Sequence, residues 1–262
     1  MGPGSTAADA EPGIGPRATV DPEEASKFAR LAERWWDPEG EFAALHALGP
    51  VRIAFVRDAI VSRWRRDPRG ARPLSGIRIL DVGCGGGLMA EPMARLGAEV
   101  TAIDAVSESV AVARQHADRQ GLRIDYRTGS VEAMAEADRR FEAVLAMEVV
   151  EHVADRRAFM ATCAELVAPG GVLFLATLNR TAKAFLFAIL GAEHILRWLP
   201  RGTHDWRKFV RPSEIAADLR ANGLDVMQIT GVGYDLVTGR WRPTKDLDVN
   251  YMLAAERPLT VR

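Results

Sequence analysis

Two carboxylates and an imidazole lie close together in the segment M-E-V-V-E-H at residues 147–152. A single helical turn would bring Glu148, Glu151 and His152 to one face. Two oxygen donors and one nitrogen donor, with coordination positions left open, suit a divalent ion such as Mg²⁺. Spacing alone also allows a plainer interpretation, in which these side chains only shape a pocket.

A glycine-rich turn lies earlier in the chain. Residues 77–82 form an apolar run that contains Asp81, and four glycines follow within residues 83–87. Glycine tolerates positive φ and lets a ligand approach the backbone, so a strand, a glycine turn and a helix in succession are typical of a nucleotide site. Asp104 ends the next apolar run, about twenty residues further on, where an acid can accept hydrogen bonds from ribose hydroxyls.

The spacing of the glycines separates two classes of enzyme. The turn reads G-x-G-G-G at 83–87, whereas dinucleotide-binding dehydrogenases carry G-x-G-x-x-G. With Asp81 just before it, the turn resembles motif I of class I S-adenosylmethionine-dependent methyltransferases. That resemblance implies that the amino acid end of the cofactor lies over the turn and that its ribose reaches Asp104.

Short apolar segments alternate with amphipathic ones after the turn, which predicts parallel βαβ units. Strands are predicted at residues 77–82, 99–103, 124–128, 141–147, 171–177, 224–230 and 249–256. Helices are predicted at residues 88–96, 107–120 (Ser107 as N-cap), 155–167 and 212–222, with an insert at 180–210. The expected fold is therefore α/β and Rossmann-like, a seven-stranded, mostly parallel sheet with helices on both faces. Its ligands should bind beyond the carboxyl ends of the strands.

The N-terminal quarter is predicted to be a helical cap over residues 21–73, ahead of a methyltransferase core over 74–262. Asp21 is a predicted N-cap, followed by Pro22 at the first helical position and by a second helix at 50–65. Residues 1–20 are rich in small residues and proline and are expected to be a disordered tail, without the apolar stretch of a secretion signal.

Composition excludes little but is informative about partners. The 262 residues are 48% hydrophobic and carry 34 basic and 35 acidic side chains, so no basic excess points to nucleic acid. The two cysteines, Cys84 and Cys163, are far apart in sequence and form no metal-ligand pair. Such usage fits a reducing cytoplasm.

Several longer segments resemble the family of ubiquinone biosynthesis O-methyltransferases, over residues 24–256. The segments are R-W-W-D-P-E-G-E-F at 34–42, L-H at 45–46, D-V-G-C-G-G-G at 81–87, M-E at 147–148, E-H at 151–152, P-G-G at 169–171, T-L-N-R at 177–180, G-A-E at 191–193, G-T-H-D at 202–205 and D-V-N-Y-M at 248–252. The glycine turn is common to the superfamily, whereas T-L-N-R, G-T-H-D and D-V-N-Y-M are specific to this family.

The resemblance implies roles for particular residues. The cofactor S-adenosylmethionine would be bound by Arg52, Gly83, Asp104 and Met147, with Arg52 reaching its carboxylate from the second cap helix. The remaining matches are the family's metal-binding triplet, Glu148, Glu151 and His152, which would also be the catalytic residues.

The implied substrate is a polyprenyl-catechol or demethylubiquinol methylated on a ring hydroxyl. A phenol with a pKa near ten is mostly neutral at pH 7, and chelation of both vicinal oxygens by Mg²⁺ would stabilise the phenolate. His152 could be a metal ligand or the base that takes the proton; we favour the ligand.

Residues 181–200 resemble an interfacial amphipathic helix, with an apolar stretch and flanking basic residues. We therefore expect contact with an anionic phospholipid surface, a cytoplasmic location at the inner membrane, and other enzymes of quinone synthesis as further partners. The alternative is an ordinary helix that covers the active site. Two rival functions are methylation of a soluble phenol and a non-catalytic membrane scaffold that binds S-adenosylmethionine; the intact triplet argues against the scaffold.

Overall fold

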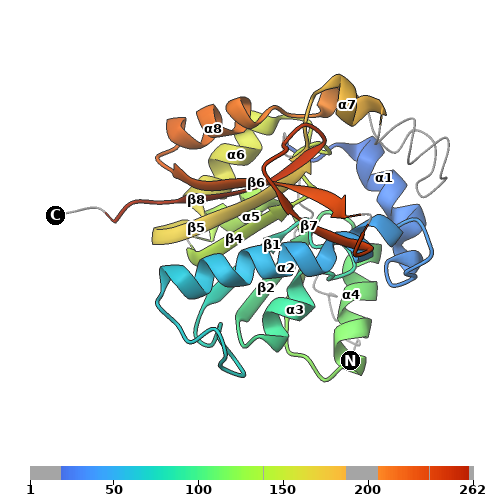
Figure 1. Ribbon diagram of the computed structural model, residues 1–262. Coiled ribbons are helices and arrows are strands. Elements are labelled where there is room, and N and C mark those ends of the chain that lie inside the picture. Colours follow the sequence, from blue (N-terminus) through green and yellow to red (C-terminus); the bar gives the residue numbers. More distant parts are fainter. Residues whose placement is uncertain (1–18, 138, 187–205, 236, 260–262) are drawn as a thin grey trace, which may run out of the picture.

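The computed structural model describes residues 19–137, 139–186, 206–235 and 237–259, and within them the chain forms an eight-stranded sheet (Figure 1). The strands are β1 Arg78–Val82, β2 Glu99–Asp104, β3 Asp125–Thr128, β4 Phe141–Met147, β5 Val167–Leu178, β6 Asp225–Asp235, β7 Arg240–Thr244 and β8 Asn250–Glu256. Their order is β3-β2-β1-β4-β5-β8-β6-β7. Strands β1 to β5 are parallel, and β8, β6 and β7 pair antiparallel.

Helices cover both faces of the sheet (Figure 1). They are α1 Pro22–Leu31, α2 Ala43–Arg63, α3 Ala90–Arg95, α4 Ser107–Arg119, α5 Val131–Glu136, α6 Arg156–Glu165, α7 Ala182–Ala184 and α8 Pro212–Ala221, with short 3₁₀ turns at Ala32–Arg34 and Trp206–Lys208. One apolar core lies between the sheet and α2, α3 and α4, and the other lies between the sheet and α5, α6 and α8. The predicted Rossmann-like class is confirmed.

The predicted count of seven strands is wrong, because the late hairpin adds β7 at the edge of the sheet. This strand, R-W-R-P-T, is not among the predicted strands, and its two arginines and proline give little apolar alternation. An edge strand tolerates Pro243, since a residue without an N–H costs nothing where no neighbour accepts it. The fifth strand also begins earlier than predicted, at Val167, and a register shift against β4 accommodates the extra residues before Val172.

Three helix predictions also need correction. The second cap helix begins at Ala43 and contains Pro50, whereas proline was expected to start it. Ser107 is the first residue of α4 and not its N-cap, which is Val106. In place of a side-chain cap, the carboxylate of Asp104 accepts a hydrogen bond from the Val106 N–H. Helix α5 was not predicted, because six residues show little periodicity.

The two segments expected to lie outside the core are described only at their ends. Val20 forms an isolated antiparallel bridge with Val153, so the described chain is attached to the core just before α1. Of the predicted membrane segment 181–200, residues 187–200 lie outside the described residues. None of the helices within the described ranges is long and apolar enough to span a bilayer.

Candidate active site

The glycine turn follows β1 and has the backbone conformation that requires glycine. Gly83 has φ +68° and Gly87 has φ +90°, in the region that side-chain-bearing residues rarely adopt. A Cβ on Gly83 would lie 2.5 Å from a methyl carbon of Val149. The turn therefore lies directly against the loop that follows β4.

Asp104 at the end of β2 is fixed by the backbone of the core. Its Oδ2 accepts a hydrogen bond from the Gly85 N–H at 2.8 Å, and its Oδ1 accepts one from the Val106 N–H at 2.8 Å. A carboxylate has about four acceptor positions, so further positions remain for ribose hydroxyls. Asp104 is thus oriented in advance for the role that the sequence predicts for it.

Buried negative charge accumulates beneath the turn. Burial raises the pKa of Asp104, and burial together with the charge of Asp104 raises the pKa of Asp81 to about 7. One carboxylate oxygen of Asp81, Oδ2, is buried without a hydrogen-bond partner. A ligand with a positive charge would stabilise both carboxylates, because an opposite charge favours the ionised form of an acid. The cationic cofactor S-adenosylmethionine fits this site.

The loop after β4 begins with a strained residue. Met147, the last residue of β4, is buried, and Glu148 after it has φ +57°, which is uncommon for a residue with a side chain. Its Oε1 accepts a hydrogen bond at 2.6 Å from Nη2 of Arg52, a buried arginine of α2. The strained backbone directs Glu148 towards the cap.

Glu151 is buried on the other side of the same loop. Its Oε2 accepts a hydrogen bond from the Thr177 hydroxyl at 2.8 Å, and its Oε1 has no partner. Burial, and then the charge of the neighbouring Glu148, raise the pKa of Glu151 well above its usual range. Two carboxyl groups thus lie near one another, with one buried oxygen unsatisfied.

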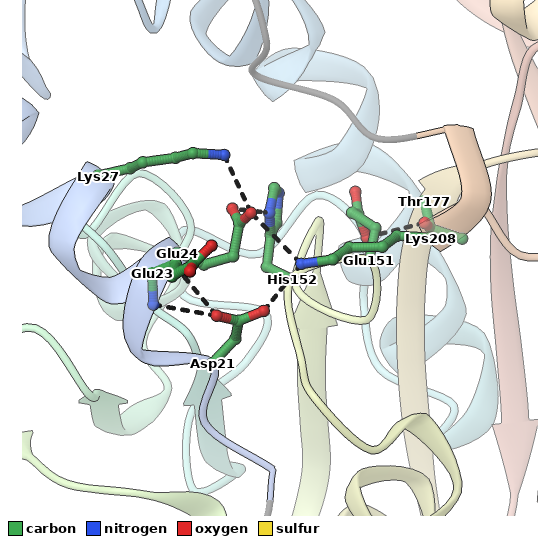
Figure 2. A network of polar contacts seen from close by, with 8 residues as sticks. All are labelled: Asp21, Glu23, Glu24, Lys27, Glu151, His152, Thr177 and Lys208. Carbon is green, nitrogen blue, oxygen red and sulfur yellow. Dashed lines mark hydrogen bonds and ion pairs between the residues drawn. The ribbon is translucent and has the colours of Figure 1, made fainter.

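His152 is bound by the N-terminal cap (Figure 2). Its Nδ1 lies 2.9 Å from Oε2 of Glu24 on α1, and Lys27 and Lys208 also contact the Glu24 carboxylate. The hydrogen bond with His152 is the main cause that lowers the pKa of Glu24 to about 2. Since an ionised carboxylate only accepts hydrogen bonds, Nδ1 carries the proton and Nε2 is the other ring nitrogen.

The three side chains expected to share one helical face do not converge. The chain after Met147 turns rather than forming a helix, and in Figure 2 His152 points to Glu24 while Glu151 points to Thr177. Within the parts of the chain that the structure describes, no group of three His, Cys, Asp or Glu side chains could hold a metal ion. The two carboxylates have suitable chemistry for Mg²⁺, but a three-ligand site is not assembled.

Three of the predicted cofactor residues lie together at the carboxyl ends of neighbouring strands. Because β1 lies between β2 and β4, the ends that carry Gly83, Asp104 and Met147 are neighbours. Arg52 reaches the same region from α2 through Glu148. Their contacts with the cofactor remain predictions.

Sequence reasoning missed two contributions of the cap. Glu24 reads as an ordinary acid in the first turn of a helix, and nothing in the sequence connects it with a histidine far along the chain. Trp35 and Trp36 read as apolar positions of a helix, yet they contact the glycine turn. The adjacent tryptophans were the only available signal, because two large aromatic groups side by side cannot both belong to one narrow helical face.

Comparison with known proteins defines the class first. Residues 80–175 match the family model for a methyltransferase domain. The magnesium protoporphyrin IX methyltransferase of Synechocystis has the same fold. Its structure with bound SAH has a TM-score of 0.62 at 20% identity, covering 89% of this chain and 95% of that chain. Its structure with bound SAM has a TM-score of 0.59 at 17% identity, covering 92% and 100%. The fold is that of an S-adenosylmethionine-dependent methyltransferase.

Closer relatives define the family. The ubiquinone biosynthesis O-methyltransferase of Sinorhizobium medicae is 51% identical over 243 residues, which cover 93% of this chain and 98% of the relative. That of a Chelativorans species is 52% identical over 242 residues, covering 92% and 96%. The chain belongs to the family of ubiquinone biosynthesis O-methyltransferases, and it is an S-adenosylmethionine-dependent O-methyltransferase.

Proposed function

We propose that this chain methylates a ring hydroxyl of polyprenyl-catechol and demethylubiquinol intermediates in ubiquinone biosynthesis. The observation that carries the proposal is the set of side chains after β4, the buried Glu151, the half-buried Glu148 and the imidazole of His152, beside the glycine turn. The relatives bear the name of this pathway, which supports the same acceptor class.

His152 is the residue we propose to handle the acceptor's proton. A phenol is mostly neutral at pH 7 and therefore a weak nucleophile. Glu24 holds the protonated Nδ1 of His152, so Nε2 can accept the phenolic proton as a general base. When bound, S-adenosylmethionine supplies the electrophilic methyl group.

Arg52 is the proposed link between the acceptor side and the cofactor. Its guanidinium has five N–H donors, and one of them binds Glu148 at 2.6 Å. The remaining donors can bind the carboxylate of the cofactor, as a charge-assisted pair in a buried position. In this proposal Arg52 orients Glu148 and the cofactor together.

The proposed Mg²⁺ site has two protein ligands rather than the three expected from the sequence. Glu148 and Glu151 are neighbouring oxygen donors, and the unsatisfied Oε1 of Glu151 supports a cation between them. His152, the third expected ligand, does not join these carboxylates in a three-ligand group within the described residues, and its Nδ1 is bound by Glu24. We propose that the two carboxylates hold the ion, and the proton transfer to His152 does not depend on it.

A contact with an anionic membrane through residues 181–200 is also proposed, with a cytoplasmic location at the inner membrane and other quinone-synthesis enzymes as neighbours. Its support is that Phe185 and Leu186 are exposed by 41% and 53% at the start of this segment. Lys183, however, binds Asp246 at 2.5 Å and Asp248 at 3.4 Å, so it is not available for lipid phosphates without breaking those pairs.

A methyl-transfer assay tests the proposal. Purified enzyme is given labelled S-adenosylmethionine with either a short-chain prenyl catechol or an unprenylated catechol, before and after chelation with EDTA. We expect a mono-O-methylated prenyl product and a higher kcat/KM for the prenyl acceptor. Equal kcat/KM for both acceptors would favour a soluble phenol as substrate, and no product from either would contradict the proposal. Full activity after EDTA would remove the role of Mg²⁺ alone.

Flotation with vesicles tests the membrane part separately. We expect recovery with anionic vesicles that falls as salt rises, because salt screens the attraction between basic residues and lipid phosphates. Protein that never floats would contradict the membrane contact and leave the chemistry untouched.

A further inference from the structure

An aromatic cluster on the cap lies between the glycine turn and His152. We call Phe28, Trp35, Trp36 and Phe42 the cap cluster. Trp35 stacks on Phe42 with ring centroids 3.7 Å apart, and Phe28 lies nearly parallel to Trp35 at 6.2 Å. Phe28 then meets the ring of His152 at right angles, at 5.1 Å. Contacts between side chains thus run from Trp35 to the imidazole.

Trp35 occupies the space that side chains on the turn would need. A Cβ on Gly85 would overlap the Trp35 ring, and a Cβ on Gly86 would overlap the Cβ of Trp35. Gly85 also has φ +50°, but Gly86 has no left-handed backbone that would require glycine. The close approach of Trp35 is therefore the structural reason for a glycine at position 86.

Polar contacts fix the orientation of both tryptophans. Trp35 donates a hydrogen bond from Nε1 to the hydroxyl of the buried Ser109 on α4 at 3.0 Å. Trp36 donates from Nε1 to the carbonyl oxygen of Gly86 at 2.9 Å and stacks on His116 at 3.5 Å. Buried indoles with a satisfied N–H adopt one defined position. The cap is therefore held on the glycine turn by specific contacts.

We propose that Trp35 is a positioning residue that couples the cofactor side to the acceptor side. Seated on Gly85 and Gly86, it holds α1 so that Phe28 and Glu24 together orient His152. Loss of this seat would loosen the cap over the cofactor and release the imidazole in one step. The inference rests on the proposed function only for the role of His152 in turnover.

Substitutions at Trp35 and Gly86 test the coupling. The single variants are Trp35→Ala, Trp35→Phe, Trp35→Gly and Gly86→Ala. The double variant is Trp35→Gly/Gly86→Ala, because alanine at position 35 would keep the Cβ that a side chain on Gly86 overlaps. Calorimetry gives the affinity for S-adenosylmethionine, and assays on the prenyl catechol give kcat and KM. For Trp35→Ala we expect losses on the order of tenfold in affinity and in kcat, because misplaced groups cost rate steeply. Trp35→Phe should recover most of both, since it keeps the stacking.

The double variant shows whether the glycine at position 86 is required by Trp35 or by the ligand. If Gly86 is a glycine because of Trp35, Gly86→Ala alone is harmful and adds nothing to Trp35→Gly, which removes the overlapping Cβ. A full additional loss would show that the ligand itself needs the glycine and would overturn the inference. Should the Trp35→Ala and Trp35→Gly proteins fail to fold, Gly86→Ala still decides. Loss of both cofactor affinity and kcat supports the coupling, and loss of cofactor affinity alone overturns it.

The matched control is Trp64→Ala, at the opposite end of the cap helix α2, where Trp64 is half-buried against the core. We expect it to change thermal stability but neither the cofactor affinity nor kcat. The same cofactor affinity and the same kcat for Trp35→Ala and Trp64→Ala would overturn the inference. If the wild-type enzyme does not methylate the prenyl catechol, the proposed function fails, and the cofactor affinities still test the seat of Trp35.

Discussion

The cofactor side and the acceptor side of the site are held by different parts of the chain. On the cofactor side, the carboxylate of Asp104 is fixed by backbone N–H groups of Gly85 and Val106, all within the α/β core. On the acceptor side, two of the three side chains after β4 are bound by cap residues, Arg52 of α2 and Glu24 of α1. The core alone thus fixes Asp104, whereas Glu148 and His152 are held by the cap.

The two sides also differ in their charge. Beneath the turn, Asp81 is buried and Asp104 is partly buried, and burial raises the pKa values of both carboxyl groups. After β4, Glu148 has Arg52 as a partner, and Glu24 lies among cationic partners that lower its pKa. The cofactor side is therefore suited to a positively charged ligand. On the acceptor side Glu148 and Glu24 are already paired, whereas one oxygen of Glu151 has no partner.

The largest expected effect is a loss of kcat when side chains of the acceptor side are substituted. Each of Glu148→Gln, Glu151→Gln and His152→Ala should lower kcat by about 10²–10⁴-fold, the usual range for loss of an acid–base group. The affinity for S-adenosylmethionine, measured by calorimetry, should change little. Glu165→Gln, an exposed glutamate on α6, is the matched control. Loss of cofactor affinity in all three variants would show that the two sides are not separate.

Asp81→Asn removes a buried carboxylate from the cofactor side and should stabilise the protein at neutral pH. The folded pKa of Asp81 is raised from 3.8 to about 7, so the folded protein binds this proton more tightly than the unfolded chain does. Stability is therefore lost as pH rises between these values, by up to about 4 kcal/mol. In urea unfolding without cofactor, the free energy of unfolding of the variant should rise relative to that of wild type from pH 4 to pH 7. The difference should stay constant above pH 7.

A gain that does not vary with pH would contradict this account of Asp81. Asp118→Asn, on the exposed side of α4, provides the comparison for an aspartate outside the site.

Asp104→Ala should weaken cofactor binding while leaving the fold intact. Loss of hydrogen bonds to a charged group costs roughly 2–4 kcal/mol, which is about 30- to 1,000-fold in the dissociation constant. Calorimetry measures the affinity, and circular dichroism checks the fold. An affinity equal to that of wild type would show that Asp104 does not bind the cofactor.

The smallest expected effect is on the stability contributed by Glu24. Its pKa is lowered to about 2, so its stabilisation is present above pH 4.5 and is lost as pH falls through that value towards 2. After a discount for solvent screening, Glu24→Gln should cost about 1 kcal/mol at pH 7. Glu23→Gln, the neighbouring first-turn acid, controls for the helix dipole. A cost that persists at pH 2 would contradict the pairing with His152.

Sequence reasoning placed the glycine turn and Asp104 correctly in the fold, because their determinants are local. A glycine turn between a strand and a helix, and an acid at the end of the next strand, are placed by the parallel sheet wherever their neighbours lie. Strand β4 was predicted with its observed bounds, Phe141–Met147, since an apolar run of this length in a parallel sheet has little alternative.

The geometry of the segment after β4 was predicted wrongly. Glu148, Glu151 and His152 were placed on one helical turn, whereas the positive φ of Glu148 starts a turn that separates them. The contact between His152 and Glu24 joins residues far apart in sequence, and neither periodicity nor spacing reports such a pair. Only the packing of the cap onto the core brings them together.

The most direct test of the account compares Asp104→Asn with Glu24→Gln in a single set of measurements. Calorimetry gives the dissociation constant for S-adenosylmethionine, and turnover of the prenyl catechol at saturating cofactor gives kcat. We predict opposite patterns, a raised dissociation constant with a largely preserved kcat for Asp104→Asn, and an unchanged dissociation constant with a lowered kcat for Glu24→Gln. If both substitutions change the same constant, the cofactor side and the acceptor side are not supported separately by the core and the cap.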